Sequence, residues 1–202
     1  MGTIISLWKK KDEPVSEFER IFRPHLNYLY RIAYRFTGST ADAEDLVQEV
    51  LLKVLPKYQG IAPGKIRPWL AKVTYRTFID RKRSFKRSPF SLLSFRDPRD
   101  DRDVVDAIQS TAPGPAEAVE RKSANKSLMQ ALSMLNEEQR AVCIMHDMEG
   151  YTLAELVSIC HAPLGTLKSR LSRARQRLKN IIGDGAFSEK SSSYKVRGNH
   201  GM

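Results

Sequence analysis

The chain has 202 residues, of which 41% are apolar, so it is long enough for one large or two small domains with packed cores. Its 34 Lys and Arg residues outnumber its 23 Asp and Glu residues, and the net charge of +11 indicates a polyanionic partner, either nucleic acid or an anionic membrane surface. The apolar runs fall short of a membrane span, the first residues do not form a secretory signal, and Cys143 and Cys160 provide no disulfide framework. We therefore expect a cytoplasmic protein without membrane insertion.

Three helical patterns occupy the first part of the chain. Apolar residues at steps of three and four predict an amphipathic helix over 15–36, restarted at Pro24. Two further helices are expected over about 42–55 and 66–83, separated by a loop with glycine and proline. We assign residues 14–87 to a first domain.

The composition changes at Ser88, where a stretch rich in proline and aspartate begins. It predicts an irregular, flexible linker over 88–115. Helices resume in a second domain over 116–182, where Asn136-Glu-Glu-Gln139 matches a capping box, and the polar residues 183–202 are expected to form a disordered tail. No β-pattern is evident, so the predicted fold class is all-α, with two small helical domains joined by the linker.

The second domain ends in a helix-turn-helix pattern. Thr152-Leu-Ala-Glu155 matches a second capping box and opens a short helix to Ile159. Cys160-His-Ala162 provides a tight turn, and Pro163 suits the first turn of a last helix that extends to about Ile182. In such a motif the second helix enters the major groove of DNA.

The last helix has an apolar face and a basic face. Its leucines, from Leu164 to Leu178, share one side at 100° per residue, and no acidic residue lies between Pro163 and Asn180. Arg can pair with guanine and Gln with adenine, while flanking cations hold phosphates. A solvated basic helix is the alternative, but the capped helix, short turn and unbroken basic face together favour DNA. The expected DNA-binding residues here are Lys168, Ser169, Arg170, Ser172, Arg173, Arg175, Gln176 and Arg177.

The helix over 42–55 presents an acidic outward face in this basic protein. Asp42, Asp45 and Glu49 point away from the apolar side, with Leu52 at their edge. The helix dipole explains the first two acids but neither Glu49 nor an exposed leucine, so a protein-docking surface is the sharper interpretation. Catalysis by these carboxylates is disfavoured, because the helix contains no histidine and no glycine-rich phosphate loop is nearby. We predict that the protein is not an enzyme and uses no cofactor.

The third helix combines core residues with a basic surface. Cations with an interleaved aromatic ring suit unpaired DNA, although Trp69 could serve the core alone. The surface residues are expected to be Lys72, Tyr75, Arg76, Arg81, Lys82 and Arg83.

Two cysteine–histidine pairs could be considered as zinc ligands. Cys143 and His146 form only half a site, and Cys160 and His161 are adjacent, which is a poor spacing for chelation. No metal site is predicted, and both cysteines are expected to be small core residues.

Taken as a set, these motifs resemble the small extracytoplasmic-function class of bacterial RNA polymerase sigma factors, in the sigma-70 family. The resemblance spans about residues 15–87 and 116–182. The chain departs from the family pattern at Tyr75-Arg76, where Arg-Asn is common, and at Arg67-Pro68, where a less rigid stretch is usual. The segments that carry the resemblance are Asp42–Val50, Trp69-Leu70, Leu135–Arg140, Gly150–Glu155 and Leu164–Leu178.

The resemblance implies a role for each surface. The first domain would be sigma region 2, with Asp45, Gln48 and Glu49 docking on the clamp-helix coiled coil of the polymerase largest subunit, beside Asp42 and Leu52. The third helix, with Trp69, would melt the minus-ten element and capture an everted base. The second domain would be sigma region 4 and read the minus-thirty-five element. Such factors direct promoter-specific initiation under stress or envelope signals and are commonly held inactive by an anti-sigma protein.

Two other function classes remain open. A stand-alone helix-turn-helix regulator would bind duplex DNA without polymerase, and a basic protein could bind RNA or a membrane surface. The acidic docking face favours the sigma factor over both.

Overall fold

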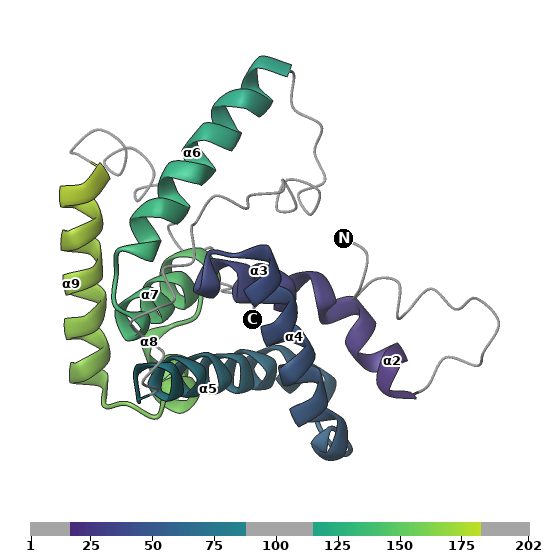
Figure 1. The fold of residues 1–202 in the computed structure, drawn as a ribbon. Helices are drawn as coiled ribbons and strands as arrows, with labels where there is room; N and C mark the ends of the chain where they lie inside the picture. Colours follow the sequence, from purple (N-terminus) through teal and green to yellow (C-terminus); the bar gives the residue numbers. More distant parts are fainter. Residues whose placement is uncertain (1–16, 88–114, 183–202) are drawn as a thin grey trace, which may run out of the picture.

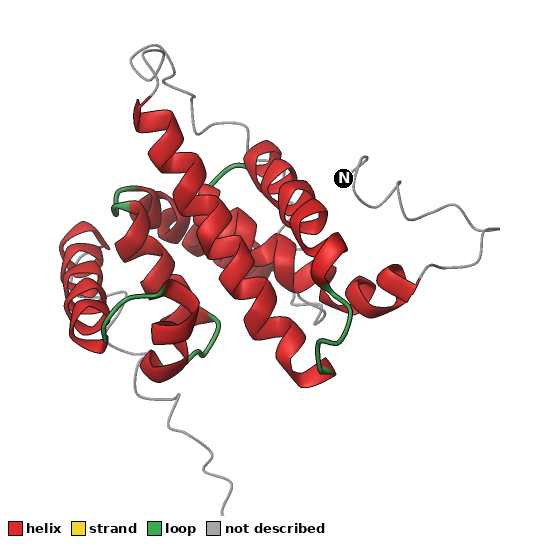
Figure 2. Cartoon of the chain, turned by 90° about the horizontal axis from the view of Figure 1, so that it is seen from below, coloured by secondary structure: helices red, strands yellow, loops and turns green. Residues whose placement is uncertain are grey.

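The computed structural model of the chain describes residues 17–87 and 115–182. All regular structure within these ranges is helical, which confirms the all-α fold class (Figure 2). The linker expected over 88–115, apart from its last residue, and the tail expected over 183–202 lie outside the described residues. Among the helices in the described ranges, none is long and apolar enough to cross a membrane.

The N-terminal group of helices begins and ends at clear local signals. Pro24 lies in a short 3-10 helix, so the long amphipathic pattern is divided in two, as expected. Gly38 adopts a left-handed φ of +74° that ends α3, and the Ser39 side chain accepts a hydrogen bond from the Asp42 backbone N–H to begin α4. The elements are α2 (Glu17–Phe22), η1 (Arg23–His25), α3 (Leu26–Thr37), α4 (Thr40–Val54), η2 (Leu55–Lys57), η3 (Pro63–Lys65) and α5 (Ile66–Arg87).

The C-terminal group contains the helix-turn-helix. The Thr152 and Glu155 capping box is complete. The box expected at Asn136 is only half formed, because the Asn136 side chain accepts from the Gln139 backbone N–H at 2.8 Å while the Gln139 Oε1 is buried without a partner. The helix that follows widens into a π-helix before Gly150, a change that the apolar spacing did not indicate. The elements are α6 (Pro115–Ser133), α7 (Glu137–Cys143), η6 (Ile144–Met148), α8 (Leu153–Cys160) and α9 (Leu164–Ile182).

The two groups pack directly against each other. Helix α3 contacts α6, α7 and η6, and α5 contacts α7 and α8. In Figure 1, α5 runs beneath α3 toward α8, while α9 lies on the outer edge and α6 projects away from the body. Buried residues from both groups form one apolar cluster. The two domains therefore form a closed body in this structure.

Truncating Leu167 should destabilise the protein far more than truncating Leu164, although the sequence pattern places both on the apolar side of α9. Leu167 is fully buried, whereas Leu164 is 43% exposed. Leu167→Ala should lower the free energy of unfolding by about 2–5 kcal/mol, because it removes buried methyl groups and leaves a cavity. Leu164→Ala should cost less than about 1 kcal/mol. Urea unfolding followed by circular dichroism measures both, and equal losses would contradict this packing of α9.

Candidate nucleic-acid interface

The helix-turn-helix places α9 against a short supporting helix. After α8, His161 adopts a left-handed conformation with φ of +50°, which turns the chain sharply before Pro163 and α9. Leu167, Leu171 and Leu178 are buried on the inner side of α9. The inner face is thus held by apolar packing, and the opposite face of the helix is free to meet solvent.

The outward face of α9 carries most of the residues predicted to bind DNA. Lys168, Ser172, Arg173, Gln176 and Arg177 are exposed. Arg173 and Arg177 are one helical turn apart, so their guanidinium groups lie on the same side of the helix. This face is therefore cationic and accessible in the closed body.

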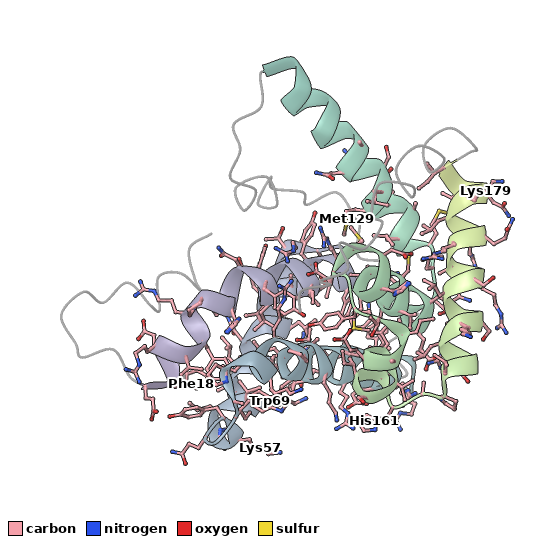
Figure 3. The ribbon with its side chains drawn as sticks, turned by 180° about the vertical axis from the view of Figure 1, so that it is seen from behind. Phe18, Lys57, Trp69, Met129, His161 and Lys179 are labelled. Atoms are coloured by element: carbon pink, nitrogen blue, oxygen red, sulfur yellow. The ribbon has the colours of Figure 1, made fainter. Side chains whose placement is uncertain are left out.

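An open groove of about 470 Å³ follows one side of α9. His146 and Leu153 form its far wall, and neither was singled out as a DNA contact from the sequence. Lys179, at the far end of α9 in Figure 3, was not among the residues predicted to bind DNA. The residues that line the groove are His146, Leu153, Lys168, Leu171, Ser172, Arg175, Gln176 and Lys179.

Two of the predicted DNA-binding arginines on α9 are engaged by acids of the preceding helices. Arg170 forms an ion pair with Glu138, and its side chain is only 20% exposed. Arg175 pairs with Asp147 through both Nε, at 3.1 Å, and a terminal nitrogen. Ser169, the remaining residue of the set, is half-buried and donates its hydroxyl to the Thr166 carbonyl.

A second basic groove, of about 510 Å³, lies between the end of α4 and the start of α5. Its lining combines the half-buried Trp69 with cations from both helices. Figure 3 shows Trp69 and Lys57 at the same end of the molecule as Phe18, opposite Lys179. Lys53 and Lys57 were not predicted to belong here, although their spacing of one turn near Pro56 could have indicated a shared side. The lining residues are Lys53, Lys57, Trp69, Lys72, Val73, Arg76, Thr77 and Asp80.

The rest of the basic surface expected on α5 is partly covered. Tyr75 is buried rather than exposed, because α8 packs over it, and burial raises the pKa of its phenol to about 12. Arg81 pairs with Glu49, and Arg83 lies 3.4 Å from Glu138. Lys82 is half-buried. The structure thus brings Trp69, Lys72 and Arg76 together and separates them from the others.

The acidic face of α4 is partly exposed. Asp45 is exposed, Asp42 and Gln48 are half-buried, and Leu52 is 70% exposed. Glu49 differs, because it forms ion pairs with Lys53 at 2.7 Å and with Arg81. Burial raises the pKa of Glu49, but the hydrogen bonds from these two cations outweigh it and leave the pKa below its usual value.

Cys143 and His146 each contact a different polar group. The Cys143 thiol lies 3.5 Å from an Asp147 oxygen, and His146 Nδ1 lies 2.6 Å from the Tyr151 carbonyl oxygen. Burial raises the pKa of both Cys143 and Cys160 to about 12. Within the described ranges, no group of three His, Cys, Asp or Glu residues is placed to hold a metal ion.

Comparison with known families matches both halves of this arrangement. Residues 21–88 match Sigma-70 region 2, and residues 125–178 match Sigma-70 region 4. The chain is 30% identical over 171 residues to the ECF RNA polymerase sigma factor SigM of Mycobacterium tuberculosis, covering 82% of this chain and 77% of that protein. The chain belongs to the ECF RNA polymerase sigma factors. Helices α2–α5 therefore contain region 2, and α6–α9 contain region 4.

Other sigma factors share this sequence or fold. The SigE factor of Mycolicibacterium smegmatis is 32% identical over 82% of the chain, which spans 61% of that protein's length. The solved structure of RpoE with the anti-sigma factor NepR from Bartonella quintana has a TM-score of 0.63 and 26% identity, covering 82% of this chain and 96% of that one. The SigJ structure of M. tuberculosis, at 26% identity and a TM-score of 0.52, covers 82% of this chain and 53% of its own.

Proposed function

We propose that the chain binds core RNA polymerase and directs it to a promoter through two separate DNA contacts, as a specificity factor without catalysis of its own. The observation that carries this proposal is the presence in one chain of two cationic surfaces, on α9 and at the α4–α5 groove, with an acidic, leucine-bearing face beside the second. A stand-alone regulator needs only the first surface. Matches to both region 2 and region 4 support the same assignment. Its place of action would then be the cytoplasm, with the polymerase.

The exposed face of α4 is the proposed polymerase contact. Leu52, 70% exposed and next to acidic side chains, offers an apolar anchor with a charged rim, which is the usual anatomy of a protein interface. Asp42, Asp45, Gln48 and Glu49 would form that rim. Because Glu49 already holds Lys53 and Arg81, we expect Asp45 and Leu52 to contribute most.

The groove between α4 and α5 is the proposed minus-ten contact. Its cations can follow a phosphate backbone, and Trp69 offers a ring on which an unstacked base can lie. An everted base costs a few kcal/mol of unstacking, which such a pocket partly recovers. We expect Trp69, Lys72 and Arg76 to make the first contacts, together with Lys53 and Lys57.

The outward face of α9 is the proposed minus-thirty-five contact. Arg173 lies almost opposite the leucine side and projects furthest, with Ser169, Ser172 and Gln176 around it, so it is the best candidate for reading a base. Lys168 lies nearer the edge but can also reach a base. Arg177 lies on the shoulder, where phosphates pass.

Control by a separate inhibitor is also part of the proposal. RpoE of B. quintana, with which this chain shares its fold and 26% identity, was solved in complex with an anti-sigma factor. We propose that an anti-sigma protein covers the acidic face of α4 or the cationic face of α9, because both are exposed in the closed body.

Run-off transcription with core RNA polymerase tests the proposed function. Adding the purified chain should convert non-specific initiation into transcripts from one promoter. The Asp45→Ala, Leu52→Ala double variant should lose most of this activity and bind core polymerase at least tenfold more weakly, because it removes the proposed anchor without touching the core.

The matched control is Glu17→Ala, which removes an exposed acid from a different helix, α2. It should transcribe normally. Sequence-specific DNA binding by the chain alone, with no effect on core polymerase, would instead identify a stand-alone regulator.

Two arginines of α9 should separate base reading from phosphate contact. Arg173→Ala should cost about 1–3 kcal/mol on the preferred minus-thirty-five sequence and flatten the preference at one or two base pairs. Arg177→Ala should weaken holoenzyme binding to all sequences about equally and reduce the salt slope by about one unit. Salt titrations on the preferred element and on single-base variants measure both effects. The opposite pattern would mean that α9 lies rotated in the groove.

A further inference from the structure

One contact between the two domains is centred on a buried carboxylate. The Glu149 side chain, at the end of η6 in region 4, is 1% exposed. It accepts hydrogen bonds from Arg31 Nε and a terminal nitrogen of Arg31, at 3.1 and 2.9 Å, and from Arg35 at 2.5 Å. Arg67 approaches at 3.4 Å. All three arginines belong to region 2, so the carboxylate joins the two domains.

Burial of the Glu149 carboxylate is energetically favourable only in the closed body, where the arginines of region 2 surround it. An unpaired ionised carboxylate removed from water carries a penalty of several kcal/mol, which opposite charges and hydrogen bonds must offset. The hydrogen bonds that Arg31 donates to Glu149 raise the pKa of Arg31 and favour its charged form. Arg67 also stacks over the Tyr28 ring, with its guanidinium carbon 4.2 Å from the ring centroid. The group is therefore a bidentate, multiply bonded cluster and not an isolated surface ion pair.

Further polar contacts reinforce the same interface. The hydroxyls of Tyr28 and Tyr151 lie 2.6 Å apart in a buried hydrogen bond between the domains. Arg140 of α7 is buried and donates to the Phe36 carbonyl at the end of α3, at 2.8 Å, while another of its nitrogens holds carbonyls of its own domain. A cation at a helix C-terminus is favourably placed. These hydrogen bonds join the domains at points separate from the Glu149 cluster.

We propose that Glu149 is a latch that holds regions 2 and 4 together in the free chain and must release Arg31, Arg35 and Arg67 before the factor can engage a promoter. The claim that release must precede promoter binding rests on the proposed function. The claim that Glu149 holds the two domains closed does not depend on it.

The closed body is incompatible with simultaneous binding to both promoter elements. Their names place them about 25 base pairs apart, which is roughly 85 Å of duplex. A compact body of roughly 140 residues has a radius of gyration of about 14 Å and so cannot reach both. Closure also buries Tyr75 under α8 and brings Arg83 to 3.4 Å from Glu138. Opening the latch would release both side chains.

The two native cysteines report whether the latch is open. Cys160 lies at the end of α8 and shares a side-chain hydrogen bond with Tyr75 across the interface, whereas Cys143 is buried inside region 4. Separating the domains uncovers Cys160 and leaves Cys143 protected. Alkylation of the free full-length chain, with mass spectrometry to locate the label, therefore distinguishes domain opening from unfolding.

The decisive variant is Glu149→Gln, which keeps the size of the side chain but leaves three guanidinium groups without their anion. We expect Cys160 to react at least tenfold faster than in the unchanged protein, with the rate of Cys143 unaltered. Raising the salt concentration should narrow the difference between the two proteins, since screening weakens the latch in the unchanged one. Tyr28→Phe, which removes one hydrogen bond, should give a smaller increase at Cys160. The control Glu17→Gln removes the same charge from α2 and should change neither rate.

Two results would overturn the latch. An unchanged Cys160 rate in Glu149→Gln would show that the carboxylate does not hold the domains together. An equal rise at Cys143 and Cys160 would show that Glu149 supports the fold of region 4 instead. The assay contains neither polymerase nor DNA, so its failure is distinct from a failure of the run-off experiment.

Discussion

The relation between the two halves of this chain depends on the cost of burying the Glu149 carboxylate. The side chain is withdrawn from water, so it must be surrounded by positive charge, and the three arginines that supply it all lie in the other domain. Once this contact forms, α8 covers Tyr75 and α7 brings Glu138 to Arg83. The position of one acid in a turn thereby decides which parts of the basic surface are accessible.

The closed body divides the cations of this protein into two classes. Arg31 and Arg35 are held by Glu149 of the other domain. Arg173, Arg177, Lys57 and Arg76 are exposed. The net charge of +11 therefore does not indicate which cations are accessible in the closed body. Free cations can make a first encounter with DNA, while the held ones become available only when the domains separate.

Local sequence signals predicted the helices and their faces well. Pro24, Gly38 and the Thr152–Glu155 capping box are signals that act over a few residues, so the boundaries they set are visible in the sequence. The periodicity of α4 and α9 likewise identified the exposed Asp45 and Leu52 and the outward Arg173 and Arg177, because a helix face follows directly from residue spacing.

The contacts between domains could not be predicted in this way. Arg31 and Glu149 are 118 positions apart, and nothing in either local pattern marks them as partners. Tyr75 was expected on a basic surface because its neighbours are cations, and its burial depends on α8, which comes later in the chain. Arg67 and Tyr75, the positions where the sequence departs from the family pattern, both contact region 4 here. Long-range pairing, rather than helix formation, is what the sequence left undetermined.

Energy transfer between labels at Ser84 and Met134 tests most directly whether the domains are closed in the free chain and separate on the promoter. Both positions are exposed and lie near the Arg83–Glu138 ion pair. The buried native cysteines allow selective labelling of cysteines introduced at these sites. Transfer should be high in the free chain and fall sharply when core polymerase and promoter DNA are added together, because the two elements are roughly 85 Å apart. High transfer that persists in the promoter complex, or low transfer in the free chain, would contradict a closed factor that opens to bind.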